Sequence, residues 1–261
     1  MSKSPKETTS WESAESWYDR CVGEKGHYYH QSVILPSLLR LLNLSARSTG
    51  SFLDLGCGQG VLARHLPEQI DYVGIDSSAS LIRDAAKQTK AKNCQFLTKD
   101  VTQPLALKKT DFDWAAFILC LQNMQDAKSA LAQAGLHVKQ NGLLLIVLNH
   151  PCFRIPRQSA WGVDEQAHLQ YRRMNMYMSS LKIPIQTHPG RGEKSSTTYS
   201  FHYPLSSYIQ WIAEAGFSVE GMEEWCSDKQ SEGGKARMEN RARKEFPLFL
   251  ALLCRKNNSF F

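Results

Sequence analysis

The chain has 261 residues, of which 42% are hydrophobic and 21% charged, and its formal net charge is +6. This balance is typical of an ordinary soluble globular protein with one large domain or two small ones. No apolar run is long enough to cross a bilayer, and the first residues, MSKSPKETTSWE, lack the apolar core of a secretory signal. We therefore expect a cytoplasmic protein without a membrane-spanning segment.

Metal centres and disulfide frameworks are not indicated. The seven cysteines are widely scattered, and none stands in a C-x-x-C or C-x-x-H spacing. We therefore expect no metal and no set of paired cysteines.

Taken in chain order, the expected elements begin with two helices around a glycine-containing turn, within residues 10–42. Between residues 51 and 149, short apolar runs alternate with segments of helical spacing, such as 77–90 and 127–139. Apolar strands separated by helices indicate a parallel sheet that is covered on both faces. The expected strands of this part are FLDL (52–55), YVGID (72–76), CQFLTKD (94–100), DFDWAAFILCL (111–121) and LLLIVLN (143–149).

The pattern changes after residue 150. Residues 151–203 show no sustained period, and so long a stretch inside a compact domain is more often a functional insertion or lid than a connector. A helical stripe (205–213) and two strands (217–225 and 247–255) follow, with a short charged helix between the strands. The predicted organisation is an N-terminal helical cap (1–50), a ligand-binding core (51–150), a substrate-side insertion (151–203) and a C-terminal helix with strands that complete the sheet (204–261).

A glycine-rich loop follows the first strand of the core, in SFLDLGCGQGVLARHL (51–66), and we expect a helix after it. Asp54 precedes Gly56, Gly58 and Gly60. The loop is no phosphate-binding P-loop, and Val61 replaces the third glycine of the dinucleotide motif. Glycines let the backbone approach a ligand at the carboxyl edge of the sheet. A carboxylate there would repel a pyrophosphate, but it suits the cationic amino-acid moiety of S-adenosylmethionine.

Two further acids end the next two strands. Asp76 stands where a carboxylate can accept both hydrogen bonds of a ribose diol, although it could instead cap the following helix. Asp100 could accept from an adenine amino group, or it could be an ordinary loop residue. Three acids at consecutive strand ends beside one glycine loop favour a common ligand.

With these motifs, DLGCGQG, GID, KD and FDWAAFILCLQNMQD, the chain resembles the class I S-adenosylmethionine-dependent methyltransferases. It is most similar to the group that includes the ubiquinone/menaquinone-biosynthesis methyltransferases. The resemblance covers residues 18–149 and, loosely, the last two strands. It implies an α/β, Rossmann-like fold: a mostly parallel seven-stranded sheet with helices on both faces and an insertion after the fifth strand.

The resemblance also implies cofactor contacts, although Phe117 departs from the small or polar residue usual in the family. The methionine moiety would be held by the acid and glycines of the loop, the ribose by the second-strand acid, and the adenine by residues after the second and third strands. The residues after the fourth strand would line the methyl-donor pocket. The implied cofactor residues are Asp54, Gly56, Gly58, Gly60, Asp76, Ser77, Asp100, Val101, Phe117 and Leu119.

Candidate acceptor residues follow the fifth strand. His150 could be a general base, or it could simply bond a loop carbonyl. Arg154 and Arg157 could hold a carboxylate or phosphate, and Tyr171 and His202 could form polar-tipped walls of the substrate site. We therefore expect a small-molecule acceptor, anionic or aromatic.

Two alternatives stay open. The basic stretch from Lys235 to Lys244 would suit an RNA methyltransferase, although no separate RNA-binding module is visible. A non-catalytic S-adenosylmethionine-binding partner protein is the other alternative, against which the complete cofactor motifs argue. The sequence does not specify an oligomeric state.

Overall fold

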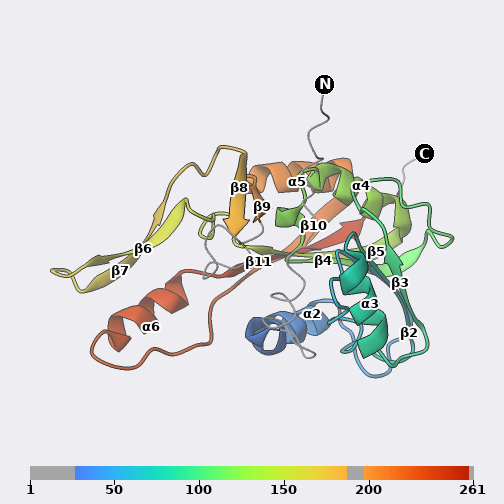
Figure 1. The fold of residues 1–261 in the computed structure, drawn as a ribbon, viewed down its shortest axis with the longest axis horizontal. Coiled ribbons are helices and arrows are strands. Elements are labelled where there is room, and N and C mark those ends of the chain that lie inside the picture. Colours follow the sequence, from blue (N-terminus) through green and yellow to red (C-terminus); the bar gives the residue numbers. More distant parts are fainter. Residues whose placement is uncertain (1–26, 187–196, 259–261) are drawn as a thin grey trace.

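A seven-stranded sheet forms the centre of the computed structural model, which describes residues 27–186 and 197–258 (Figure 1). The strand order is β10-β11-β5-β4-β1-β2-β3, and within this sheet β11 alone runs antiparallel to its neighbours. The predicted mostly parallel sheet is therefore confirmed. Its strands are β1 (Gly50–Leu55), β2 (Ile70–Asp76), β3 (Cys94–Thr98), β4 (Phe112–Ile118), β5 (Val138–Asn149), β10 (Phe217–Trp225) and β11 (Phe249–Lys256).

Helices cover both faces of the sheet because successive strand residues point to opposite sides. In β1, Leu53 packs into the core beneath α4 (Ala127–His137) and α5 (Leu205–Glu214). Its neighbour Phe52 packs on the other face. That face is covered by the π-helical segment η2 (His30–Ile34), α2 (Leu35–Leu41) and α3 (Ala79–Gln88) (Figure 1). The first of the two helices predicted within residues 10–42 lies mostly outside the described residues.

The segment after the glycine loop differs from the prediction. Residues 58–65 form consecutive turns instead of the regular helix that we expected. Gly60 has a φ of 69°, which lies outside the helical region, so the chain cannot enter a helix directly from the loop. Val61 and Leu62 are nevertheless buried, and they pack on the same face as α2.

The insertion after β5 is more regular than its sequence indicates. It contains two antiparallel hairpins, one of β6 (Ser159–Asp164) and β7 (Leu169–Met174), the other of β8 (Leu181–Gln186) and β9 (Thr197–His202). The predicted charged helix is present as α6 (Ala236–Glu245), between β10 and β11. The β6–β7 hairpin and α6 protrude together from the sheet, and we refer to them as the arm (Figure 1).

Contacts between the hairpin and α6 hold the arm together. Trp161 of β6 packs edge-on against Phe246, with ring centroids 5.4 Å apart, and Arg241 donates to the carbonyl oxygen of His168 at 2.8 Å. Among the described residues, no helix is long and apolar enough to span a membrane.

Candidate active site

The glycine loop lies at the carboxyl end of β1, where the strand directs it towards the edge of the sheet. Gly56, Gly58 and Gly60 have φ values of 81°, 54° and 69°, a region that glycine occupies without steric cost. At Gly56 space is restricted as well, because an added Cβ would stand 2.7 Å from the Cβ of Cys120. The loop therefore presents backbone, with few side chains, to a ligand at this edge.

Asp54 is buried beneath the loop, with 2% of its surface exposed. The hydroxyl of Tyr72 donates to its Oδ2 at 2.7 Å, whereas Oδ1 has no hydrogen-bond partner. Burial raises the pKa of Asp54 from 3.8 to about 7, against the lowering effect of the Tyr72 hydrogen bond. A buried carboxylate oxygen without a partner is costly unless a ligand supplies a donor.

Asp76 ties the end of β2 to the glycine loop. Its Oδ2 accepts from the backbone N–H of Gly58 and its Oδ1 from that of Ser78, both at 2.9 Å. Ser78 is the N-cap of α3, so Asp76 is not itself the helix cap. Each carboxylate oxygen can accept a further hydrogen bond, which leaves Asp76 able to accept from ribose hydroxyls.

We predict that Asp76→Ala weakens the binding of S-adenosylhomocysteine by about 1.5–3 kcal/mol, the range for hydrogen bonds to charged groups. Asp71→Ala is the matched control, because Asp71 is exposed near the opposite end of the same strand. Calorimetric titration of both variants measures the difference. Unchanged affinity together with a lowered melting temperature in the Asp76 variant would assign Asp76 to loop stability alone.

The other predicted cofactor residues divide into two groups. Asp100 and Ser77 are exposed after the ends of β3 and β2, although Oδ1 of Asp100 already accepts from the N–H and hydroxyl of Thr102. Leu119 follows β4 and has a φ of 52°, which is unusual for leucine. In contrast, Val101 and Phe117 are buried in the core on the α4 side. The structure therefore gives no support for a cofactor contact by the Phe117 side chain.

His150 follows β5 and is buried, with both ring nitrogens engaged. Its Nε2 lies 2.7 Å from Oε1 of Glu224 on β10, and its Nδ1 accepts from the N–H of Cys152 at 3.2 Å. Burial lowers the pKa of His150, and Glu224 partly offsets this. The neutral ring thus donates to Glu224 and keeps no free lone pair for a substrate proton. The general-base role stays a prediction that this geometry does not favour.

The backbone of His150 also stabilises the turn that contains Arg154. The carbonyl oxygen of His150 accepts from the N–H groups of Phe153 and Arg154, at 3.1 and 2.8 Å. His150→Ala keeps this carbonyl but loses the side chain, and we predict that it lowers the free energy of unfolding by about 2–3 kcal/mol because the Cys152 N–H and Glu224 lose their partner. Urea denaturation measures this, with Glu224→Gln, which keeps an acceptor for Nε2, as the milder comparison. A His150 variant of full stability that loses activity together with an inflection of the pH–rate profile would instead support the general-base role.

The remaining predicted substrate residues are dispersed. Arg157 is exposed, with a φ of 60°. Tyr171 pairs with Gly162 and covers it, so it lies on the opposite face of the β6–β7 hairpin from Trp161. His202 is buried at the end of β9, where its Nε2 lies 2.7 Å from the carbonyl oxygen of Tyr177. Of the four predicted residues, Arg154 alone lines the cavity described next.

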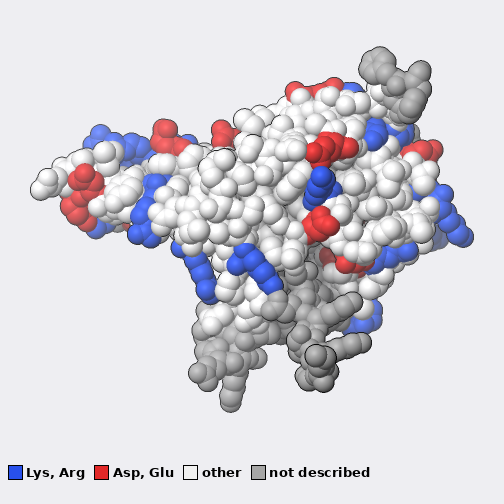
Figure 2. Space-filling view, turned by 90° about the horizontal axis from the view of Figure 1, so that it is seen from above, with Lys and Arg blue, Asp and Glu red and all other residues white. Residues whose placement is uncertain are grey.

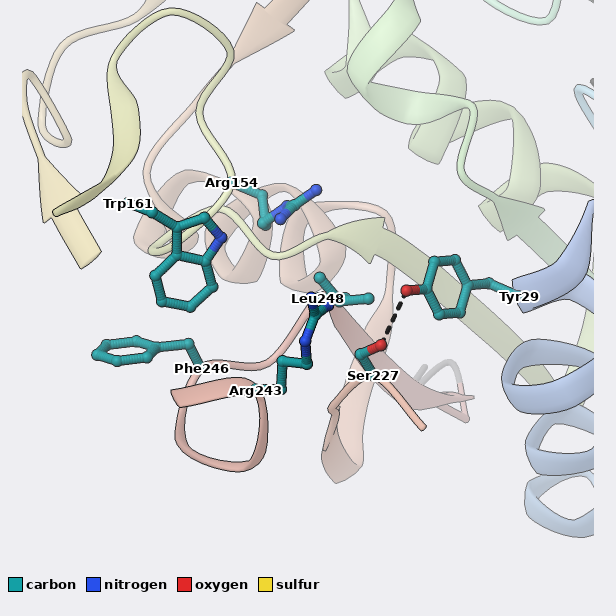
Figure 3. Close-up of a pocket in the computed structure, with 7 residues that line it drawn as sticks. All are labelled: Tyr29, Arg154, Trp161, Ser227, Arg243, Phe246 and Leu248. Atoms are coloured by element: carbon teal, nitrogen blue, oxygen red, sulfur yellow. Dashed lines mark hydrogen bonds between the residues drawn. The ribbon is translucent and has the colours of Figure 1, made fainter. Parts of the chain in front are cut away.

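A cavity of about 200 Å³ lies between the arm and the carboxyl ends of β5 and β10 (Figure 3). The lining residue Leu248 lies at these strand ends. Its N–H donates to the carbonyl oxygen of Trp225, the last residue of β10, and its carbonyl oxygen accepts from the N–H of His150, which follows β5. Trp161 and Phe246 lie on one side of the cavity, and Tyr29 lies on the other. The hydroxyl groups of Tyr29 and Ser227 are hydrogen-bonded at 2.8 Å. The cavity is lined by Tyr29, Arg154, Trp161, Ser227, Arg243, Phe246 and Leu248.

Of these seven residues, Arg154 was predicted as a site residue and the other six were not. Arg243 belongs to the basic stretch of the RNA alternative, and Phe246 stands two residues after its end. The one feature of the sequence that indicates a place for this stretch at the site is its position between the last two strands. Because β10 ends at the same edge as β5, an insertion there reaches the mouth of the site.

The donors and acceptors at the loop fit S-adenosylmethionine. The cofactor's ammonium group needs a carboxylate acceptor, and Oδ1 of Asp54 lacks a donor. Its carboxylate needs donors, and the buried Gln59 side chain, within the same loop, has no partner for either of its polar atoms. Asp76 would accept from the ribose. Among the described residues, no cluster of His, Cys, Asp and Glu could hold a metal ion.

The chain is similar to known methyltransferases in sequence and in fold. A Geobacillus sp. (strain WCH70) protein named as a methyltransferase is 25% identical over 231 residues, which cover 80% of this chain and 90% of that protein. Pavine N-methyltransferase of Thalictrum flavum subsp. glaucum is 23% identical over 183 residues, covering 67% of this chain and 50% of that enzyme. The fold is similar to that of an S-adenosylmethionine-dependent methyltransferase from Mesorhizobium loti, with a TM-score of 0.66 at 20% identity, covering 87% of this chain and 99% of that one.

A family model described as a methyltransferase domain matches residues 26–221. The match spans the glycine loop, Asp76, the insertion and most of β10. The chain therefore belongs to the methyltransferase-domain family and is an S-adenosylmethionine-dependent methyltransferase of class I.

Proposed function

We propose that the protein methylates a small molecule, which enters between the glycine loop and the arm and occupies the cavity at the ends of β5 and β10. The observation that carries this proposal is the position of that cavity on the cofactor's edge of the sheet. Two strand spacings, about 10 Å, separate β1 from β5. An acceptor in the cavity could thus reach a methyl group held above β1 and β4.

Methyl transfer requires chiefly that the protein align the acceptor with the methyl group and exclude water. The cofactor, when bound, supplies an electrophilic methyl group. The loop and Asp76 would fix its position, and the arm would cover the acceptor. No proton needs to be removed when the attacking atom carries none, so the engaged state of His150 is compatible with turnover.

The RNA alternative finds less support. Arg241 and Arg172 donate to backbone carbonyl oxygens, and Lys235 pairs with Glu165, so these basic groups are engaged by other residues of the chain. Figure 2 shows acidic side chains interspersed with basic ones on the visible face of the arm, without a continuous basic strip. An extended phosphate backbone would need such a strip.

Radiolabelled methyl transfer tests the proposal. The protein is incubated with methyl-labelled S-adenosylmethionine and either a metabolite fraction or total RNA. We expect label in small molecules that remain soluble in acid. Label confined to acid-precipitable RNA would contradict the proposal and favour the alternative. The narrower grouping with the ubiquinone/menaquinone-biosynthesis methyltransferases, the four-part division of the chain and the cytoplasmic location stay predictions.

A further inference from the structure

Three arginine side chains from separate elements meet around Trp161. Arg154 and Arg243 line the cavity with it, and the guanidinium of Arg172 on β7 lies 5.0 Å from the centroid of its ring. Burial and the positive charge of Arg154 both lower the pKa of Arg172, so these two cations are close enough to repel each other. The arm and the turn after β5 thus bring like charges together.

In the described part of the chain, no carboxylate compensates these charges. Arg172 donates to the carbonyl oxygen of Phe153 and to the hydroxyl of Ser159, at 2.9 and 2.8 Å. Arg243 donates to the hydroxyl of Ser231 at 3.0 Å, and its buried Nε has no partner. For Arg154, a partly buried group, no hydrogen bond or ion pair is found among the described residues.

As far as the described residues go, this arrangement is costly without a bound anion. Burying a charge without a counter-charge is unfavourable, and repulsion between neighbouring cations adds to the cost. The seven residues that line the cavity include no Asp or Glu, and Glu224 at the nearby end of β10 is engaged by His150. A bound anion would relieve both effects, and guanidinium groups match the geometry of carboxylates and phosphates.

The rest of the lining is apolar on one side. Trp161 and Phe246 provide that wall (Figure 3), and Leu248 is a further apolar lining residue. The volume of about 200 Å³ exceeds the roughly 150 Å³ of an engineered protein cavity that holds benzene. A single ring that bears an anionic group is therefore of suitable size.

We propose that this cavity binds the carboxylate or phosphate group of the methyl acceptor, held by Arg154 and Arg243, with a ring or an apolar group of similar size against Trp161 and Phe246. This inference rests on the proposed function, since it assigns the acceptor to this cavity. It adds the charge of the acceptor, and it makes Arg243 of α6 a specificity-determining residue.

Binding of simple probes tests the charge preference without turnover. The full chain, saturated with S-adenosylhomocysteine, is titrated with benzoate, phenyl phosphate, benzylamine and benzyl alcohol, and binding is followed by ligand-observed NMR. We expect at least one anion to bind at least tenfold more tightly than the amine and the alcohol. Benzoate and phenyl phosphate distinguish a carboxylate from a phosphate site.

Matched variants locate the binding. Arg154→Gln and Arg243→Gln should each weaken anion binding by about 10- to 100-fold, the effect of losing one charge-assisted hydrogen bond. Arg237→Gln is the control, because Arg237 is exposed on the same helix. Affinity for S-adenosylhomocysteine and the melting temperature show whether each variant is folded.

The outcomes separate this inference from the proposed function. Binding of benzylamine as tight as that of the better-bound anion, no binding of either anion, or wild-type anion binding by a folded Arg243→Gln variant would each overturn the assignment of an anionic acceptor. The labelled-methyl assay is independent of these probes. Label in a cationic or neutral small molecule would leave the proposed function standing and refute the anion, whereas label only in RNA would refute the proposed function itself.

Discussion

Asp54→Asn is expected to stabilise the cofactor-free protein at pH 8 and, at the same time, to abolish most of its affinity for S-adenosylmethionine. Folding raises the pKa of Asp54 from 3.8 to about 7, so the ionised form opposes folding. The free energy of unfolding should therefore fall as the pH rises from about 4 to 7 and then level off. At about 1.4 kcal/mol per pKa unit, the loss is at most about 4 kcal/mol.

The asparagine variant avoids this loss, because it is neutral and can still accept from the Tyr72 hydroxyl. Urea denaturation should thus show it to be more stable than the wild type at pH 8 and equally stable near pH 4. Without the carboxylate, the cofactor's ammonium group loses a buried charged partner, which costs about 3–5 kcal/mol of affinity. Tyr72→Phe is the control, since it keeps the carboxylate. An asparagine variant that is less stable at pH 8, or that binds the cofactor normally, would contradict this account of Asp54.

Gly56→Ala should destabilise the fold by about 2–5 kcal/mol and prevent cofactor binding. Its φ of 81° costs an L-residue about 1–2 kcal/mol. The added Cβ would also stand 2.7 Å from the Cβ of Cys120 and 2.8 Å from its Sγ, and overpacking of this kind costs about 1–3 kcal/mol. The loop would then have to move away from β4, and the backbone would no longer follow the surface of the cofactor.

A second glycine separates the two contributions. Gly233, before α6, has a φ of 91°, but nothing lies within 4 Å of its added Cβ. Gly233→Ala should therefore cost only the backbone strain, about 1–2 kcal/mol, and should leave cofactor affinity unchanged. Thermal denaturation of both variants measures the contrast. Equal destabilisation of the two would show that the contact between the loop and Cys120 is unimportant.

The fold could be predicted, and candidate cofactor residues could be named, from the sequence because their signals are local. Strands β1, β2 and β4 are rich in apolar residues, and Asp54, the glycines and Asp76 lie near or directly after the ends of β1 and β2. A short stretch of chain thus specifies both the strand and the position of its end at the carboxyl edge. The β6–β7 hairpin lacks this signal, because Leu169, Tyr171 and Arg173 on one face of β7 are exposed.

The acceptor side depends on contacts between distant segments. His150 is engaged by Glu224, which is 74 residues further along the chain, and Trp161 meets Phe246 only because α6 lies along the hairpin. The register of β5 against β11 and of β11 against β10 determines these neighbours. No periodicity in one segment reveals that register. The sequence could therefore suggest Arg154 as a candidate but not the partner of His150 or the wall formed by Trp161.

A crystal structure of the protein with S-adenosylhomocysteine tests the central claim most directly. We expect the amino-acid end of the ligand to lie against Asp54 and the glycine loop, the ribose to lie on Asp76, and the sulfur to face the cavity lined by Arg154 and Arg243. A ligand bound away from the glycine loop, or a sulfur atom that faces an open groove outside this cavity, would contradict it.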